Sequence, residues 1–238
     1  MHLTLGILRT SQVVFYAFSF FQLDGFAVPA PAQVTQTVGQ TLHAKSKKAE
    51  NLAIISFKRI NTMKYIVLLR KINAGKENRI DMKSLKQLFE LPGYDSVATY
   101  INSGNVIFNS QKGMKILEKE IDGKLFEHFK HKIQFILKSH DEIKKIADSI
   151  PKAWQNNNDQ RTDVAYLFEE IDKPNTINEL PMKIDFIEIK YVKGAIIWHL
   201  KKENYNKSQL NKLISHQHYQ HMTLRNVNTA RYLASLKD

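Results

Sequence analysis

The sequence predicts an α+β fold of two ferredoxin-like (α/β-plait) subdomains, the first with the order β-α-β-β-α-β and the second a variant plait with extra helices. Three observations support this fold class. Apolar runs of strand length alternate with helical patterns, a glycine hairpin divides the first half, and further short strands follow in the second half. The predicted divisions are an N-terminal extension over residues 1–62, a first plait over 63–139 and a second plait-like subdomain over 140–238.

The first half contains its strand and helix patterns in the order that a plait requires. Residues 64–70 are almost continuously apolar, which suits a central strand that is buried on both faces. A helix follows, which Asp81 can cap and which Pro92-Gly93 ends. The last strand, residues 133–137, follows a second helix whose apolar residues recur at helical spacing: Met114, Leu117, Ile121, Leu125 and Phe129.

A hairpin over residues 99–108 lies between these two helices. β-branched and aromatic residues on both sides of the turn favour strands, and Gly104 supplies the positive φ that a tight connection needs. Asn102, Ser103 and Asn105 place amides and a hydroxyl beside freed backbone N–H groups. A well-formed turn and a cradle for an anion or polar ligand both account for this pattern.

The second half predicts three strands and three or four helices. Ser139 and Glu142 form a capping box ahead of a helix that Pro151 stops, and a final helix runs from about Asn226. The predicted strands are residues 164–168, 184–192 and 195–200, and the further helices lie near residues 173–181 and 210–214.

The composition is basic and contains no cysteine. The formal net charge of +12 attracts phosphates and acidic surfaces, although the lysines are spread along the chain and also suit a solvated basic surface. The absence of cysteine excludes disulfides, thiolate catalysis and cysteine-ligated zinc. It suits a reducing compartment, so we expect a cytoplasmic protein with no membrane segment in residues 63–238.

The N-terminal extension leaves three interpretations open. Residues 13–21 are apolar but too short for a membrane-spanning helix, and with Arg9 before them and small residues at 27–32 they loosely imitate a secretory signal, which would make the protein secreted. Residues 33–52 are polar and are predicted to be disordered. Alternatively, translation starts at Met63 and residues 1–62 are upstream sequence read in frame, or they form an extension of another kind.

From Met63 onward the chain resembles a bacterial family known only as a domain of unknown function, numbered sixteen ninety-seven. The resemblance implies two α/β-plait halves and no established activity. It is carried by four stretches in order: Arg70-Lys71-Ile72-Asn73, Thr99-Tyr100-Ile101-Asn102-Ser103-Gly104-Asn105-Val106, Lys207-Ser208 and Thr223-Leu224-Arg225-Asn226-Val227-Asn228-Thr229.

This sequence departs from the family pattern at three places. The family usually has glycine where Lys71 stands, a second glycine near Ala74-Gly75, and tryptophan where Val227 stands. The lysine argues against close approach of a ligand to the backbone of that loop, and the valine removes a stacking surface.

We expect a ligand site between the two halves. In a β-α-β-β-α-β sheet the first strand lies beside the third, so the residues after the first strand approach the hairpin. Arg225-Asn226 is expected at the start of the last helix, where free N–H groups favour anions, and arginines suit phosphate or carboxylate. Caps and interdomain hydrogen bonds are the alternative role for these residues. The expected ligand-binding residues are Arg70, Asn73, Ser103, Gly104, Asn105, Arg225, Asn226 and Asn228.

Catalytic and cofactor signatures are weak. His216, His218 and His221 form a cluster without a carboxylate or cysteine at ligand spacing, so neither a metal nor another cofactor is predicted. Ser103 and Ser208 have no evident His–Asp partners, and no paired carboxylates suggest acid–base hydrolysis, so the sequence leaves enzyme activity undecided.

The expected partner is an anionic small molecule. A sequence-nonspecific nucleic-acid-binding module is an alternative, although the hairpin lacks the paired aromatics that stack bases in RNA-recognition domains. A protein–protein adaptor is a third alternative, and the sequence predicts no oligomeric state.

Overall fold

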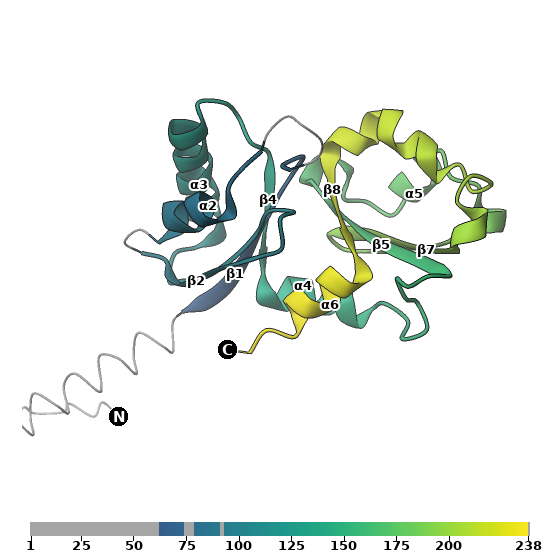
Figure 1. The fold of residues 1–238 in the computed structure, drawn as a ribbon, viewed down its shortest axis with the longest axis horizontal. Coiled ribbons are helices and arrows are strands. Elements are labelled where there is room, and N and C mark those ends of the chain that lie inside the picture. Colours follow the sequence, from purple (N-terminus) through teal and green to yellow (C-terminus); the bar gives the residue numbers. More distant parts are fainter. Residues whose placement is uncertain (1–61, 74–78, 91–92, 238) are drawn as a thin grey trace, which may run out of the picture. The chain divides into compact units, whose positions relative to one another are not determined.

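The computed structural model describes residues 62–73, 79–90 and 93–237, and within them the strands form two four-stranded antiparallel sheets (Figure 1). The N-terminal extension lies outside the described residues. The first sheet has the order β2-β3-β1-β4, from β1 (Met63–Leu69), β2 (Asp95–Tyr100), β3 (Asn105–Ser110) and β4 (Phe135–Ser139). The second has the order β6-β7-β5-β8, from β5 (Gln160–Leu167), β6 (Glu188–Val192), β7 (Ala195–Lys201) and β8 (Met222–Asn226).

In each sheet the first strand along the chain lies between the third and the fourth, so the structure is consistent with two plait-like halves. The α-helices are α2 (Met82–Phe89), α3 (Met114–Phe129), α4 (His140–Asp148), α5 (Thr176–Glu179) and α6 (Val227–Ala234). The crossovers of the second half use short 3-10 helices, η1 (Glu169–Ile171), η2 (Ile184–Phe186), η3 (Lys202–Asn204), η4 (Leu210–Ser215) and η5 (Gln217–His221). The described residues belong to one compact unit of the chain, and the predicted boundary between residues 139 and 140 stays a prediction.

Strand alternation divides the interior into three cores. Side chains of β1 at Tyr65, Val67 and Leu69 pack in an outer core under α2 and α3, whereas Ile66 and Leu68 point to the opposite face. That opposite face belongs to a central core that both sheets share with α4 and α6, which lie side by side in Figure 1. A third core covers the far face of the second sheet. The almost continuous apolar run of β1 is therefore explained by burial on both faces.

Several local predictions are confirmed. The Asp81 carboxylate accepts a hydrogen bond from the backbone N–H of Ser84 at 2.8 Å and caps α2. Ser139 and Glu142 form the capping box of α4, and Asn226 caps α6. The apolar stripe of α3 faces the outer core of the first sheet, with Leu117, Ile121 and Leu125 fully buried.

The second half differs from the prediction in one consequential way, because it has a fourth strand, β8, and Arg225 lies on that strand instead of at the start of the last helix. In β8, Met222 and Leu224 face the outer core of the second sheet. Thr223 and Arg225 point the other way, toward the first sheet, where both bond to the carbonyl oxygen of Leu69. The sequence prediction missed this alternation because it placed Arg225-Asn226 at the start of the last helix and predicted no strand before it.

Three further elements differ from the prediction in their bounds or their helix type. The predicted strand 184–192 begins only at Glu188, after the 3-10 turn η2, and the predicted helix at 210–214 is the 3-10 helix η4. Residues 133–134 also lie outside β4, which begins at Phe135.

The turn between β2 and β3 depends on Gly104, which has a φ of +74°. A β-carbon built there would lie 2.8 Å from the β-carbon of Leu69 and even closer to the Ile72 side chain. The carbonyl oxygen of Gly104 accepts the backbone N–H of Leu69 at 2.8 Å, which ties the turn to the end of β1. Only glycine therefore satisfies both the backbone conformation and the packing at this position.

We expect Gly104→Ala to lower the free energy of unfolding by at least about 2 kcal/mol, because the left-handed backbone and the clash add together. Urea denaturation of both proteins measures this difference. Gly123→Ala is the matched control, since Gly123 lies within α3 and a β-carbon there meets nothing within 4 Å. It should stabilise the protein by up to about 1 kcal/mol. Equal effects of the two substitutions would contradict the account of the turn.

A buried histidine makes the stability of the second sheet sensitive to pH. His199 is 8% exposed and stacks on Trp154 with ring centroids 5.2 Å apart. The Thr162 hydroxyl donates to the carbonyl oxygen of Gln155, so the Nδ1–H of His199 donates to the Thr162 oxygen at 2.7 Å. Burial lowers the pKa of His199, and the charge of Glu188 partly opposes that shift.

Because the folded protein disfavours the charged imidazole, the unfolded chain binds more protons as the pH falls below the ordinary histidine pKa of 6.5. We therefore expect the free energy of unfolding to fall between about pH 7 and pH 5, and to fall less steeply in His199→Phe. Denaturant titrations across this range measure both slopes. The same slope in the two proteins would show that another group carries the dependence.

Candidate functional site

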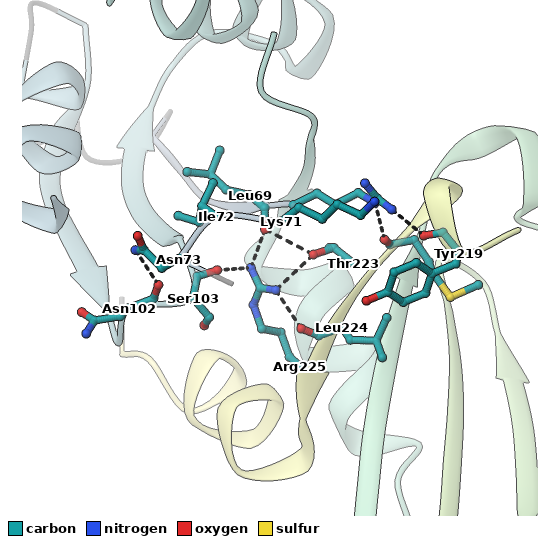
Figure 2. A pocket seen from close by; sticks show the side chains of 12 residues that line it. Leu69, Lys71, Ile72, Asn73, Asn102, Ser103, Tyr219, Thr223, Leu224 and Arg225 are labelled. Atoms are coloured by element: carbon teal, nitrogen blue, oxygen red, sulfur yellow. Dashed lines mark hydrogen bonds between the residues drawn. The ribbon is translucent and has the colours of Figure 1, made fainter. Parts of the chain in front are cut away.

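A cavity of about 430 Å³ lies where the end of β1, the β2–β3 turn and β8 meet (Figure 2). No aspartate or glutamate is among its lining residues. Those residues are Leu69, Arg70, Lys71, Ile72, Asn73, Asn102, Ser103, Tyr219, Met222, Thr223, Leu224 and Arg225.

Arg225 is 6% exposed and its guanidinium lies in the middle of the residues shown in Figure 2. Its five N–H groups all have acceptors, and the carbonyl oxygen of Gly104 lies at 3.4 Å as a further neighbour. The acceptors are Asn105 Oδ1 at 2.6 Å, Leu224 O at 2.8 Å, Ser103 O at 2.8 Å, Leu69 O at 3.0 Å and Thr223 Oγ1 at 3.1 Å. Arg225 thus connects β8 to β1, β3 and the turn, and has no N–H group left for a ligand.

All the acceptors around Arg225 are neutral. Burial lowers its pKa to about 10, so the guanidinium keeps its charge at neutral pH. Since the lining residues include no acid, the charge of Arg225 contributes a fixed positive potential to the cavity, although none of its N–H groups is free to bond a ligand.

Arg70 is also buried, with 8% exposure, but its guanidinium is only partly bonded. Nε donates to Met222 O at 3.0 Å, Nη2 to Tyr219 O at 2.9 Å and Nη1 to Gln134 Oε1 at 3.2 Å. Among the described residues nothing accepts the second N–H of Nη1 or of Nη2. Burial also lowers the pKa of Arg70. Arg70 is therefore the arginine that offers donors to a ligand.

Lys71 adds a second cation at the cavity. Its ammonium lies 5.7 Å from the centroid of the Tyr219 ring, and the guanidinium carbon of Arg70 lies 5.5 Å from the same centroid. Across residues 62–73, 79–90 and 93–237, no carboxylate pairs with Lys71. The sequence analysis treated Lys71 as an argument against close approach, whereas its side chain lines the cavity.

The backbone around the cavity is strained. Lys71 and Asn73 each have a φ of 54°, and Ile101, in the β2–β3 turn, has a φ of 48°. The left-handed region favours glycine and is unusual for a β-branched residue such as isoleucine. Strained conformations of this kind cluster at functional sites in proteins.

Asn73 has a structural function. Its side-chain amide donates to Asn102 O at 2.9 Å and to Ile80 O at 3.0 Å, and its oxygen accepts the backbone N–H of Ile80 at 2.7 Å. It thereby fixes the chain after β1 against the β2–β3 turn. Asn73 lines the cavity, but its polar atoms are already bonded within the protein.

The structure brings four of the eight expected residues to the cavity: Arg70, Asn73, Ser103 and Arg225. Gly104 and Asn105 do not line it, and Asn105 is fully buried beneath, where it accepts from Arg225. Asn226 accepts the backbone N–H of Thr229 at 2.9 Å, and Asn228 donates to Asn156 O at 3.4 Å. The positions of the four residues outside the cavity favour the alternative role, in which they form caps and internal hydrogen bonds. Ligand binding by any of the eight expected residues stays a prediction.

The sequence analysis missed Lys71, Tyr219 and Thr223 as cavity residues. Thr223 follows from the alternation within β8, which the sequence shows. No sequence signal places Tyr219 there, because it reaches Arg70 across a separation of 149 residues.

The histidine cluster has a carboxylate neighbour that sequence spacing did not reveal. His218 Nε2 lies 2.6 Å from the carboxylate of Glu179, and His216 Nδ1 accepts the backbone N–H of His218 at 3.2 Å. Within the described ranges, no group of three or more metal-ligating side chains is placed to hold a metal ion.

No helix in the described part of the chain combines the length and the apolar character needed to cross a membrane. The cytoplasmic location stays a prediction.

Comparisons with known proteins agree with the resemblance noted in the sequence. The family model described as "Protein of unknown function (DUF1697)" matches residues 63–198, so the expected resemblance is confirmed there. The two C-terminal stretches that also carried the resemblance lie beyond the match. No curated protein matches the chain.

Among solved structures, the chain is similar to a bacterial protein over most of both chains. That protein is the conserved bacterial protein SP0830 from Streptococcus pneumoniae, with a TM-score of 0.64 and 26% sequence identity. The similarity covers 73% of this chain and 97% of that protein.

We expect Arg225→Ala to lower the free energy of unfolding by more than about 3 kcal/mol, because it leaves buried carbonyl and amide oxygens without donors. Arg231→Ala is the control, since Arg231 bonds to Pro151 O at 3.0 Å in an exposed position. Arg231→Ala should lower the free energy of unfolding by less than about 1 kcal/mol. Chemical denaturation measures both. A small loss in Arg225→Ala would show that the internal contacts of Arg225 do not stabilise the fold.

Proposed function

We propose that this chain, which belongs to the DUF1697 family of proteins of unknown function, binds a small anionic ligand with phosphate or carboxylate groups in the cavity between its two halves. In this proposal each half is a ferredoxin-like plait, and the ligand lies where the two plaits meet. The observation that carries the proposal is the buried, partly unbonded guanidinium of Arg70 in a cavity lined by no acid.

A buried cation with unused N–H donors lowers the stability of the folded protein, because the free energy lost when the cation leaves water is not recovered in hydrogen bonds. An oxyanion beside Arg70 would accept the two unused N–H groups and form charge-assisted hydrogen bonds. Lys71 would contribute a second, mobile cation at the same anion. The remaining charge comes from Arg225, which lines the cavity and attracts an anion by its charge alone, since its N–H groups are bonded within the protein.

The volume of the cavity also favours a small molecule. About 430 Å³ lies within the usual range of ligand pockets and exceeds what one inorganic anion fills. Leu69, Ile72 and Leu224 supply apolar wall, while Asn102 and Ser103 supply polar groups at the turn. This mixture suits an organic body that carries the anionic group.

The proposal includes no reaction. Arg225 is unsuitable for separating cavity binding from a diffuse basic surface, because its hydrogen bonds hold the structure together. Lys71 is the better choice, because it makes no hydrogen bond or ion pair within the described residues and its backbone conformation favours glycine.

We expect inorganic phosphate and citrate, tested separately on the full chain, to raise the melting temperature, and Lys71→Gly to remove most of that rise. The variant should be as stable as the parent or more stable by up to about 1 kcal/mol, because glycine relieves the left-handed backbone. A thermal-shift titration at low ionic strength measures both effects.

The matched control is Lys130→Gly, which removes the same charge from a lysine with a φ of 60° that does not line the cavity. This variant should keep the rise in melting temperature. Equal loss in both variants would favour a diffuse basic surface and the nucleic-acid alternative. No rise in the parent protein with either anion would reject the proposal.

A further inference from the structure

We infer that the ligand carries two adjacent phosphate groups, one beside Arg70 and Lys71 in the cavity and the second beside Lys132 in a neighbouring hollow. This inference rests on the proposed function and names the class of ligand for the same site. The adjoining hollow has a volume of about 140 Å³ and shares Arg70, Lys71 and Ile72 with the cavity.

The hollow is basic on both sides. Besides the shared residues it is lined by His131, Lys132, Ile133 and Gln134, so it contains no acid. His131 Nδ1 lies 2.8 Å from the carbonyl oxygen of Phe129, which fixes its ring. Lys132 is exposed and, over the described ranges, makes no hydrogen bond or ion pair. After Arg70 and Lys71, Lys132 is therefore a third cation available to a ligand.

Arg70 lies at the boundary between the two spaces. Its Nη1 contacts Gln134, a wall of the hollow, while its Nε and Nη2 contact Met222 and Tyr219, which line the cavity. The unused N–H groups are on Nη1 and Nη2, so the guanidinium can donate to two different oxygen atoms. Two adjacent phosphates would share this guanidinium, with an oxygen of one accepting from Nη1 and an oxygen of the other accepting from Nη2, because the planar guanidinium holds these donors in fixed positions.

The charges agree with a diphosphate better than with one phosphate. Arg70, Lys71 and Lys132 present three cations over two joined spaces, whereas a single phosphate beside Arg70 and Lys71 would leave the hollow beside Lys132 empty. On its other side Lys132 borders a separate space that is lined by Glu118, Asp122 and Glu170. A third space of about 280 Å³, also in contact with Arg70 and Lys71, is lined by uncharged polar groups such as Ser215, Gln217 and Gln220, together with His216. It offers hydrogen bonds to an uncharged part of the ligand but no further lysine or arginine.

Adjacent phosphates occur in small diphosphate compounds and in the backbone of nucleic acids. Both kinds of ligand would be recognised by their pair of adjacent phosphates. A small diphosphate compound is favoured over a nucleic acid because Arg70, Lys71 and Lys132 line discrete cavities. Calorimetric titration of the full chain with inorganic phosphate, pyrophosphate and a short single-stranded oligothymidylate separates these sources. All titrations use one ionic strength and a buffer without phosphate.

We expect the parent protein to bind pyrophosphate at least about tenfold more tightly than phosphate. Lys132→Gln should weaken pyrophosphate binding about tenfold while changing phosphate binding less than about twofold. The control is Lys202→Gln, which removes an exposed lysine that lines none of the three spaces. It should leave both affinities unchanged. Circular dichroism of each variant confirms that the fold is retained.

The outcomes separate the two proposals. If phosphate binds but Lys132→Gln weakens both ligands equally, or pyrophosphate binds no more tightly, the second phosphate site is rejected and the anion site stands. If neither anion binds, the proposed function fails and this inference fails with it. Oligothymidylate binding that is tighter than pyrophosphate binding and lost in Lys132→Gln would assign the adjacent phosphates to a nucleic acid.

Discussion

The buried guanidinium of Arg225 is the interaction on which the arrangement of the two halves depends. It comes from an edge strand of the second sheet and bonds to the end of β1, the β2–β3 turn and Asn105 of the first sheet. Removing any one of these acceptors would leave a buried N–H group of the guanidinium unbonded, which is more costly than losing an exposed contact. The relative position of β1, the turn and β8 is therefore strongly restrained, and these are the segments that enclose the cavity.

The two arginines have different functions because their hydrogen bonds differ. Arg225 has every donor bonded to neutral oxygen atoms, so it holds the structure together and still contributes charge. Arg70 has two donors unused, and Lys71 beside it has no carboxylate partner in the described part of the chain. The strained backbone at Lys71 and Asn73 persists because Asn73 is bonded to both Ile80 and Asn102. The structure thus restrains the framework and leaves Arg70 and Lys71 available to a ligand at the cavity.

The sequence was most informative where local chemistry determines structure. The caps at Asp81 and Ser139, the apolar stripe of α3 and the turn at Gly104 follow from interactions within a few residues. The fourth strand of the second sheet was missed because the face that it turns to the first sheet carries Thr223 and Arg225, which are polar although buried, so it does not resemble a core strand. Half of the expected site residues reach the cavity. Ligand binding by the others stays a prediction, and the place of Asn105 beneath the cavity could not be read from the sequence because it bonds to Arg225 across 120 residues.

The central claim is that Arg225 is saturated by the protein while Arg70 remains available. Nuclear magnetic resonance of the side-chain Nε–H groups, followed during a titration with inorganic phosphate, tests it most directly. The account predicts that the Arg70 signal shifts in a saturable way while the Arg225 signal stays in place. A saturable shift of Arg225 equal to that of Arg70, or a shift of Arg225 alone, would contradict the claim.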